Sequence, residues 1–289
     1  MPLHSSVVGQ PLPPVEMDVT PRMALAYSAG IGEESDAAFD DTRDGFAATP
    51  MFCVTPEWQF VISARNRNLG LKPEEGIRGV HAGQYTQFRA PILAGRRVRV
   101  SGMIAAVRQT RAGALSTTQM DITDIESGTL LTTTRSDGMY RDVAVEGGDR
   151  VADASGDGLP SPVDLSNAQE VAIPLDRWFA HRYTECASIW NPIHTEQRVA
   201  LAAGLPGTIV HGTALWALAG KVIANAYAAG NSQRLAALGG RFSAMVPAGT
   251  PITVQHAPVA ETPGLIAFAV LNSRRETAVS AGFARLRPA

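Results

Sequence analysis

The longest run of apolar residues begins at Gly212 and continues almost without interruption to Ala229. On a helical projection, apolar side chains such as Leu215 and Trp216 fall on every side of this segment. A helix with no polar face is buried within a fold and does not lie on its surface. The pattern therefore predicts a central helix that ends near Gly230 and that other elements must enclose.

Alternating apolar and polar residues predict strands in two groups, each of which follows a helix. The first group follows a helix that starts at Thr55-Pro56, a good N-cap and first-turn pair. Its strands are expected at 81–88, 98–103, 114–125 and 129–140, and those of the second group at 252–256, 265–272 and 277–286. A helix followed by antiparallel strands forms an α+β unit, so two such units are expected.

A stretch dominated by Gly, Asp, Pro and Ser separates the two groups, between residues 142 and 170. This composition is typical of a linker. We therefore predict an N-terminal domain over residues 1–145, a linker over 146–168 and a C-terminal domain over 169–289. Residues up to about Pro21 are rich in proline and polar residues and are expected to form a docking tail, followed by a short helix from Met23 to Gly32.

One segment of the first half is echoed in the second half. Residues 88–100 read FRAPILAGRRVRV, and residues 242–254 read FSAMVPAGTPITV. Both segments lie at the same place in their unit, before a predicted strand, and share the Phe, Ala-Gly and alternating apolar positions. This similarity predicts that the chain arose by duplication of one structural unit.

Composition narrows the range of possible ligands. The chain of 289 residues is long enough for two small domains with their own cores. Its 25 Lys and Arg residues nearly balance 27 Asp and Glu residues, and no basic run occurs. This balance argues against a nucleic-acid partner or an anionic membrane surface and favours a small-molecule ligand.

Cysteine usage and hydropathy indicate the compartment. Cys53 and Cys186 are the only cysteines and lack metal-site spacing, so neither a disulfide framework nor a zinc site is expected. The N-terminus has no signal-peptide pattern, and Lys221 and Asn225 interrupt the longest apolar segment. We therefore expect a cytoplasmic protein without a membrane span.

The start of the central helix is the main candidate for chemistry. Gly212 has no side chain, and the first-turn amides of a helix have no intrahelical acceptor, so this end can stabilise a developing oxyanion. His194 lies upstream and can transfer a proton near neutral pH. Together they suggest enolate or acyl chemistry. A purely structural role for both residues is the alternative, because glycine before a buried helix relieves crowding and a single histidine is often only hydrogen-bonded.

A family resemblance sharpens this interpretation. The segment SIWNPIH, residues 188–194, with His211-Gly212 downstream, resembles the hydratase-2 signature of MaoC-like enoyl-CoA hydratases. Residues 23–32, 80–85 and 240–249 look like segments of the double-hotdog hydratases of peroxisomal multifunctional enzymes. The resemblance implies an α+β double hotdog, in which two antiparallel sheets each wrap a long central helix. It also implies that the N-terminal half is non-catalytic and gives room to the acyl tail.

The resemblance also implies roles for individual residues. The backbone N–H of Gly212 would bind the thioester oxygen, His194 would transfer protons, and Asn191 would position one of the reacting partners, which gives a 3R-hydroxyacyl product. Arg241 is expected to contact a coenzyme A phosphate. His211, Thr213 and Phe242 complete the expected substrate-binding residues.

The sequence departs from the family at one position. Members pair the histidine with an aspartate two residues before the asparagine, where this chain has Ile189. Glu185, one helical turn earlier, could substitute for the acid, or His194 could act alone on an easier substrate, or catalysis could be lost and a thioester-binding module retained. Cys186 beside His194 would instead give a thioesterase or an acyltransferase.

We therefore expect a hydro-lyase that acts on an enoyl or 3-hydroxyacyl thioester. The acyl group would be carried by coenzyme A or by an acyl carrier protein. No separate cofactor and no metal are expected, because coenzyme A is part of the substrate. A homodimer is the expected assembly.

Overall fold

The computed structural model describes residues 2–68, 71–72, 79–152 and 163–288. Residues 153–162 of the predicted linker lie outside this part of the chain. The chain forms two compact units. The N-terminal unit comprises Met1–Asp18, Pro56–Ala90 and Arg97–Leu159, and the C-terminal unit comprises Val19–Thr55, Pro91–Arg96 and Pro160–Ala289. Residues 19–55, which the sequence analysis assigned to the first domain, thus pack with the second unit.

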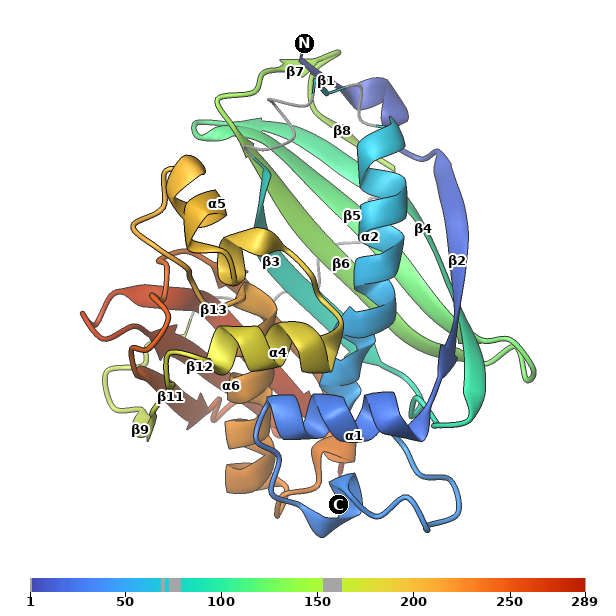
Figure 1. Cartoon of the computed structure of the whole chain (residues 1–289), viewed down its shortest axis with the longest axis vertical. Helices are drawn as coiled ribbons and strands as arrows, with labels where there is room; N and C mark the ends of the chain where they lie inside the picture. Colours follow the sequence, from blue (N-terminus) through green and yellow to red (C-terminus); the bar gives the residue numbers. More distant parts are fainter. Residues whose placement is uncertain (1, 69–70, 73–78, 153–162, 289) are drawn as a thin grey trace. The chain divides into compact units, whose positions relative to one another are not determined.

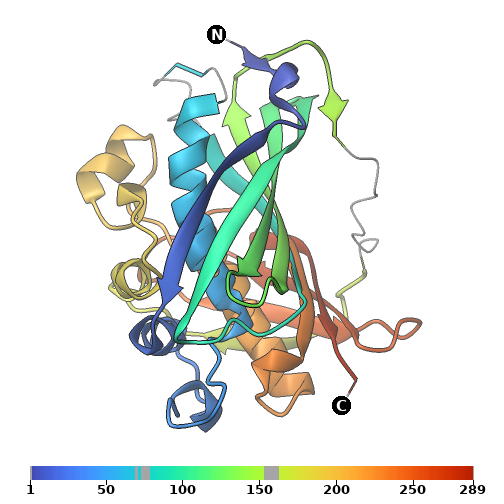
Figure 2. The same ribbon diagram turned by 90° about the vertical axis from the view of Figure 1, so that its right-hand side faces the viewer.

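The N-terminal unit is an antiparallel sheet packed on one helix (Figure 2). Its strands lie in the order β2 (Pro11–Val19), β4 (Arg96–Thr110), β5 (Gly113–Asp124), β6 (Leu130–Arg141) and β3 (Gly79–Phe88). Short strands β1 (Leu3–His4) and β7 (Val145–Glu146) pair with each other, and β8 (Arg150–Val151) pairs with β4.

The helix of this unit, α2 (Val54–Asn68), is tied to the sheet by a buried carboxylate. Glu57 in its first turn is only 3% exposed. Its carboxylate accepts hydrogen bonds from Gln84 Nε2 on β3, at 3.0 Å, and from the Thr134 hydroxyl on β6. A buried charge requires such partners, so these polar groups fix α2 against the sheet.

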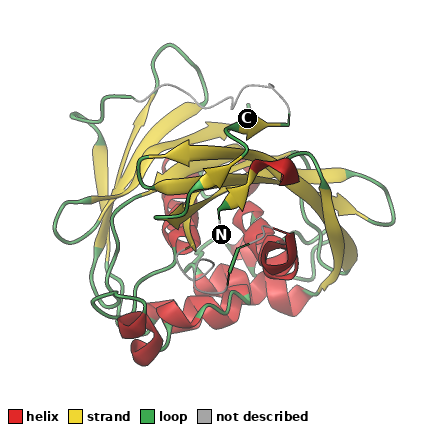
Figure 3. Cartoon of the chain, turned by 90° about the horizontal axis from the view of Figure 1, so that it is seen from above, coloured by secondary structure: helices red, strands yellow, loops and turns green. Residues whose placement is uncertain are grey.

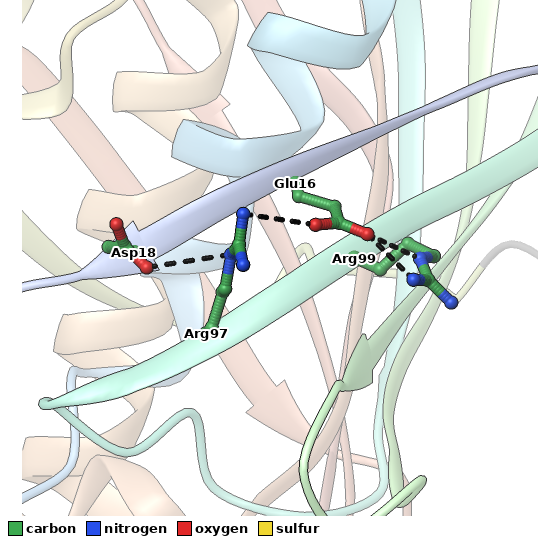
Figure 4. Close-up of polar contacts among 4 residues, drawn as sticks. All are labelled: Glu16, Asp18, Arg97 and Arg99. Carbon is green, nitrogen blue, oxygen red and sulfur yellow. Dashed lines mark hydrogen bonds and ion pairs between the residues drawn. The ribbon is translucent and has the colours of Figure 1, made fainter.

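The predicted docking tail is wrong, because residues 11–19 form strand β2 at the edge of the sheet. Its Leu12 and Val19 are buried, while Glu16 and Asp18 form ion pairs with arginines of β4 (Figure 4). Arg99 Nη2 lies 2.6 Å from Glu16 Oε1. An edge strand tolerates proline, which misled the sequence interpretation. Exposed ion pairs add little stability, but these pairs link residues of β2 and β4 and so favour this alignment of the two strands.

The C-terminal unit is built around α6 (Gly212–Tyr227), the predicted central helix (Figure 1). Its strands lie in the order β10 (Leu235–Phe242), β13 (Thr277–Leu286), β12 (Leu265–Leu271), β11 (Ile252–Pro258) and β9 (Gln169–Ile173). Residues 214–220 and 222–224 of α6 are buried, which confirms that this helix is enclosed. In the described part of the chain, no helix combines the length and the apolar character that crossing a bilayer requires.

Two shorter helices of the C-terminal unit pack closely side by side. Helix α1 (Pro21–Gly30) starts at an N-cap, where Thr20 accepts a hydrogen bond from Met23 N at 3.2 Å. It packs against α4 (Phe179–Ala187), and a Cβ at Gly30 would lie 2.6 Å from Cys186 Cβ. The contact explains why α1 belongs to the C-terminal unit.

Short helical segments complete the described chain: η1 (Ser5–Val7), η2 (Asp36–Ala38), η3 (Pro50–Cys53), η4 (Pro192–His194), α5 (Gln197–Ala202) and η5 (Ser232–Arg234).

The two units repeat one topology, as the sequence echo predicted. The order β2-β4-β5-β6-β3 corresponds to β9-β11-β12-β13-β10, and in each unit the helices lie on one side of curved strands (Figure 3). The turns before β4 and β11 both need glycine, because Gly95 and Gly249 have φ values of 80° and 79°. Isolated bridges pair Ala47 with Leu93 and Ile209 with Pro247 next to these turns.

We expect Gly282→Ala to destabilise the C-terminal unit. A Cβ at Gly282 would lie 2.5 Å from the carbonyl oxygen of Phe268 on the paired strand, so the backbone would have to shift. Overpacking of this kind costs about 1–3 kcal/mol, measurable by urea denaturation. Exposed Arg285 on the same strand gives the control, since Arg285→Gln should change the free energy of unfolding by less than about 0.5 kcal/mol. Equal stability of the two variants would contradict the close approach.

Candidate active site

His194 lies at the end of η4, a short turn that the sequence Asn-Pro-Ile-His forms by itself. Asn191 caps this turn, and its Oδ1 accepts a hydrogen bond from Ile193 N at 3.5 Å. The His194 ring donates from Nδ1 to the carbonyl oxygen of Ile209, at 2.8 Å. Donation from Nδ1 fixes the tautomer and leaves the lone pair on Nε2, which is the atom that can accept a proton.

The ring of His194 stacks on His211, the residue immediately before α6. The two ring centroids are 3.6 Å apart and the planes differ by 24°. His211 is only 2% exposed, and its Nε2 lies 3.2 Å from the Thr184 hydroxyl oxygen on α4. The Tyr183 ring packs against His211 with centroids 5.0 Å apart. These contacts place the imidazole of His194 beside the start of α6.

Both imidazoles are neutral at neutral pH. Burial lowers the pKa of His194 to about 4, and the hydrogen bond to Ile209 opposes this shift only in part. Burial and the nearby His194 place the pKa of His211 well below its usual range, with a partly opposing contact to the Ile189 backbone. A buried imidazolium loses its hydration and would repel a second one stacked on it. The base form of His194 is therefore fully populated at pH 7.

The first turn of α6 offers two amide groups. His211 is the N-cap residue, but its side chain accepts no hydrogen bond from the first turn. The first backbone hydrogen bonds are donated by Ala214 N and Leu215 N to the His211 carbonyl oxygen. Within the described residues, no acceptor binds the amides of Gly212 or Thr213. A Cβ at Gly212 would lie 3.0–3.2 Å from ring atoms of Phe242 on β10. A side chain at this position would therefore require the Phe242 ring to shift by a few tenths of an ångström.

The position that carries aspartate in the resembled family is an apolar residue here. Ile189 follows the C-terminus of α4 and is 5% exposed. Glu185, the suggested substitute acid, is exposed on α4, and no hydrogen bond between it and either histidine occurs in the part of the chain that the structure describes. The buried side of α4 instead presents Thr184 to His211. Thr184 was not among the site residues expected from the sequence; it directly precedes Glu185 on α4 but is buried, whereas Glu185 is exposed.

The other expected site residues lie near the same helix end. Phe242 contacts Gly212, and Arg241 precedes it on β10 with an exposed side chain that forms no ion pair with any described residue. Thr213 accepts a hydrogen bond from the hydroxyl of Tyr183, at 3.1 Å. Tyr183 is fully buried, and the sequence analysis did not single it out.

A nucleophilic cysteine is not favoured by this geometry. Cys186 lies at the contact between α1 and α4, with its Cβ against Gly30. Burial raises the pKa of its thiol, although Arg182 opposes the shift. A thiol with a raised pKa is a poorer nucleophile because less thiolate is present. The histidine pair and the helix start remain the reactive part of this unit.

This arrangement can bind an oxygen at the helix start and move a proton beside it. Backbone amides at a helix N-terminus stabilise negative charge, and a neutral imidazole accepts a proton. In the described part of the chain, no group of three or more His, Cys, Asp or Glu side chains is placed to hold a metal ion. The chemistry that the geometry supports is therefore acid–base transfer next to an oxyanion.

Comparison with known families agrees with this chemistry. Residues 162–264, which contain the histidine pair and α6, match the family model of the MaoC-like domain. The enoyl-CoA hydratase ChsH3 of Mycobacterium tuberculosis is 26% identical over 263 residues, covering 88% of this chain and 89% of that protein. The fatty acid synthase beta subunit pkiC of Emericella nidulans is 32% identical over 95 residues, covering 33% of this chain. The chain spans only 5% of the length of that synthase subunit.

Solved structures share the fold. A MaoC-like dehydratase from Phytophthora capsici superposes with a TM-score of 0.82 at 18% identity, covering 98% of both chains. A Mycobacterium tuberculosis protein described as a double hotdog superposes with a TM-score of 0.58 at 14% identity, covering 96% of this chain and 94% of that one. The predicted double hotdog is thus confirmed. Residues 162–264 thus match the MaoC-like domain, and most of the chain is similar to an enoyl-CoA hydratase and to MaoC-like dehydratases.

Proposed function

We propose that the protein is a hydro-lyase that interconverts a 2-enoyl thioester and the corresponding 3-hydroxyacyl thioester, with coenzyme A as the acyl carrier. The observation that carries the proposal is the stacked pair of His194 and His211 at the start of α6. This stack places a neutral base with an available Nε2 next to two amides that have no acceptor in the described part of the chain. Hydration of an enoyl thioester requires both, because a proton moves while negative charge develops on the thioester oxygen.

The amide end of α6 would stabilise the enolate. The thioester carbonyl oxygen accepts a hydrogen bond from Gly212 N, and this bond strengthens as the oxygen becomes an oxyanion. A preorganised donor of this kind is worth roughly 3 kcal/mol in the transition state. The Phe242 ring, which lies close to Gly212, would shield this face of the helix end from water.

His194 would transfer the proton by itself. In the hydration direction, Nε2 removes a proton from water while the water oxygen bonds to C3, and the electron pair of the double bond forms the enolate. The imidazolium then returns that proton to C2, which regenerates the neutral ring and leaves the 3-hydroxyacyl thioester. One group is sufficient for both steps, because the proton removed from water is the proton delivered to carbon.

Ile189 explains why a single base is proposed. A carboxylate at this position would stabilise the imidazolium and raise the pKa of His194. Burial without a carboxylate lowers this pKa, so His194 is a weaker base and the substrate must be correspondingly more reactive. A binding protein without catalysis is the second candidate, and the buried Ile189 is the observation that favours it.

The carrier is proposed from charge. Arg241 is exposed beside Phe242, and a guanidinium pairs well with phosphate oxygens. Coenzyme A and the prosthetic group of an acyl carrier protein both bear phosphate, so the acyl carrier protein is the alternative carrier. The cytoplasmic location and the homodimer stay predictions.

We expect the purified protein to hydrate crotonyl-CoA or a longer enoyl-CoA, seen as loss of the ultraviolet absorbance of the enoyl thioester. His194→Ala should lower kcat/KM by at least about 10²-fold, because it removes the acid–base group. His4→Ala, the same change at an exposed histidine of the N-terminal unit, is the control and should leave the rate unchanged. Full activity of His194→Ala would contradict the assignment of the base. Binding of acyl-CoA in calorimetry without turnover at any chain length would favour the binding protein.

In a plot of kcat/KM against pH, the acidic limb should lie at a lower pH than that of an ordinary histidine. Protonation removes the Nε2 lone pair, so kcat/KM should fall as the pH drops through about 4, the pKa of His194 in the free protein. The folded state is less stable at low pH for the same reason: the unfolded chain binds more protons between about pH 6.5 and 4, so unfolding becomes easier as the pH falls. Circular dichroism at each pH separates unfolding from titration. An acidic limb near pH 6.5 in folded protein would contradict the lowered pKa.

Ile189→Asp tests whether only the acid is absent. A carboxylate beside His194 should raise kcat by about tenfold or more and move the acidic limb to higher pH, because it favours the imidazolium. Ile189→Asn is the matched control, since it has the same shape as aspartate without the charge and should give neither effect. A folded Ile189→Asp variant without any gain would show that the pocket itself differs from that of a two-group hydratase.

A further inference from the structure

The hydroxyl group of Thr213 has an unusual environment at the second position of α6. Tyr183 Oη donates a hydrogen bond to Thr213 Oγ1 at 3.1 Å. Thr213 therefore acts as an acceptor in this bond, and its own hydroxyl hydrogen is available to a different partner. Thr213 is half-buried, so this group lies between the core and the surface at the helix end.

The phenol that donates this bond is rigidly placed. Tyr183 is fully buried. Its ring stacks on Phe179, with centroids 6.3 Å apart, and also packs against His211. Burial raises the pKa of Tyr183 to about 12, while hydrogen bonding to Thr213 and Tyr27 opposes the rise. The phenol keeps its proton over the whole range of neutral pH and remains a donor to Thr213.

The carbonyl that a threonine hydroxyl usually binds within a helix lies outside α6 in this case, because the helix begins only one residue before Thr213. In a helix, threonine commonly donates to the carbonyl four residues earlier, which for Thr213 is that of Ile209. The Ile209 carbonyl instead accepts the hydrogen bond from His194 Nδ1, at 2.8 Å. Among the described residues, no acceptor receives the hydroxyl hydrogen of Thr213.

We propose that Thr213 donates its hydroxyl hydrogen to the thioester oxygen of the substrate and that Tyr183 is the positioning residue that orients it. The inference rests on the proposed hydro-lyase function and adds a side-chain donor to the backbone donor Gly212. Tyr183 makes no contact with substrate in this scheme. Its hydroxyl donates to Thr213 Oγ1, so the threonine hydrogen is left to bind the substrate oxygen.

A double-mutant cycle tests the pair. Tyr183→Phe removes the hydroxyl and keeps the ring that packs on His211, and Thr213→Val keeps the shape of threonine without its hydroxyl. Thr213→Val should lower kcat about tenfold and Tyr183→Phe about fivefold, with KM changed less than about threefold, since a bond made mainly in the transition state is lost. The double variant should match Thr213→Val, because Tyr183 acts through Thr213. Thr213→Ser should retain most of the rate.

A second readout does not require turnover. Acetoacetyl-CoA is a thioester whose enolate absorbs in the near ultraviolet, so the apparent pKa of the bound molecule measures how well the site stabilises an oxyanion. Thr213→Val and Tyr183→Phe should each raise this pKa, by about one unit for Thr213→Val. Tyr140→Phe is the control, because it makes the same change at a buried tyrosine of the N-terminal unit and should leave the bound enolate unaffected.

The two readouts separate the two proposals. If enoyl thioesters are not hydrated but the bound enolate still responds to Thr213→Val and Tyr183→Phe, the hydro-lyase function fails and the donor pair stands. If hydration proceeds and Thr213→Val leaves both kcat and the enolate pKa unchanged, the donor pair is overturned. Additive losses in the double variant would overturn the positioning role of Tyr183. Failure of the wild-type protein to bind acetoacetyl-CoA would overturn the inference as well.

Discussion

The enclosure of helix α6 is the constraint on which the C-terminal unit depends. Nearly every side chain from Ala214 to Ala224 is buried, so the sheet and neighbouring segments must enclose the body of the helix. The N-terminal end is the one that lacks a side-chain cap. Burying a helix of this kind while its first amides have no protein acceptor leaves a positive, preorganised end, and a ligand oxygen can satisfy it.

The same burial determines the character of the base. His194 and His211 stack within the wall that surrounds the helix start, where a charged imidazole would lose its hydration without gaining a carboxylate. Both rings are therefore neutral, and their hydrogen-bonding sides are fixed by Ile209 and Thr184. Apolar Ile189 is consistent with this environment, since an acid at that place would have changed the charge of the pair. In the proposed mechanism, the site relies on orientation and on a neutral base more than on a charged acid–base pair.

Comparison of the two units shows how one topology acquires different chemistry. The strand orders correspond throughout, and the glycine turns before β4 and β11 have the same conformation. The helix of the N-terminal unit, however, carries Glu57 in its first turn, bound internally by Gln84 and Thr134. The Glu57 carboxylate is thus hydrogen-bonded within the N-terminal unit. Helix α6 instead starts with glycine, and the backbone amides of its first turn stay available to a ligand. The two units thus share a backbone topology and differ in the residues at the helix start, and this difference is the reason for proposing the reaction in the C-terminal unit.

The sequence by itself determined the elements that depend on local pattern: the enclosed helix, the strands of both units, the repeated glycine turns, and the Asn-Pro-Ile-His turn that carries the base. Tertiary structure decided what depends on distant neighbours. Strand β2 forms because its proline-rich segment finds an edge and arginine partners on β4. Tyr183 and Thr184 enter the site, and Glu185 stays outside, because the rotation of α4 is set by its packing on α1 and on α6. Periodicity reports which side chains share a face, but only packing between segments far apart in the chain decides what that face contacts.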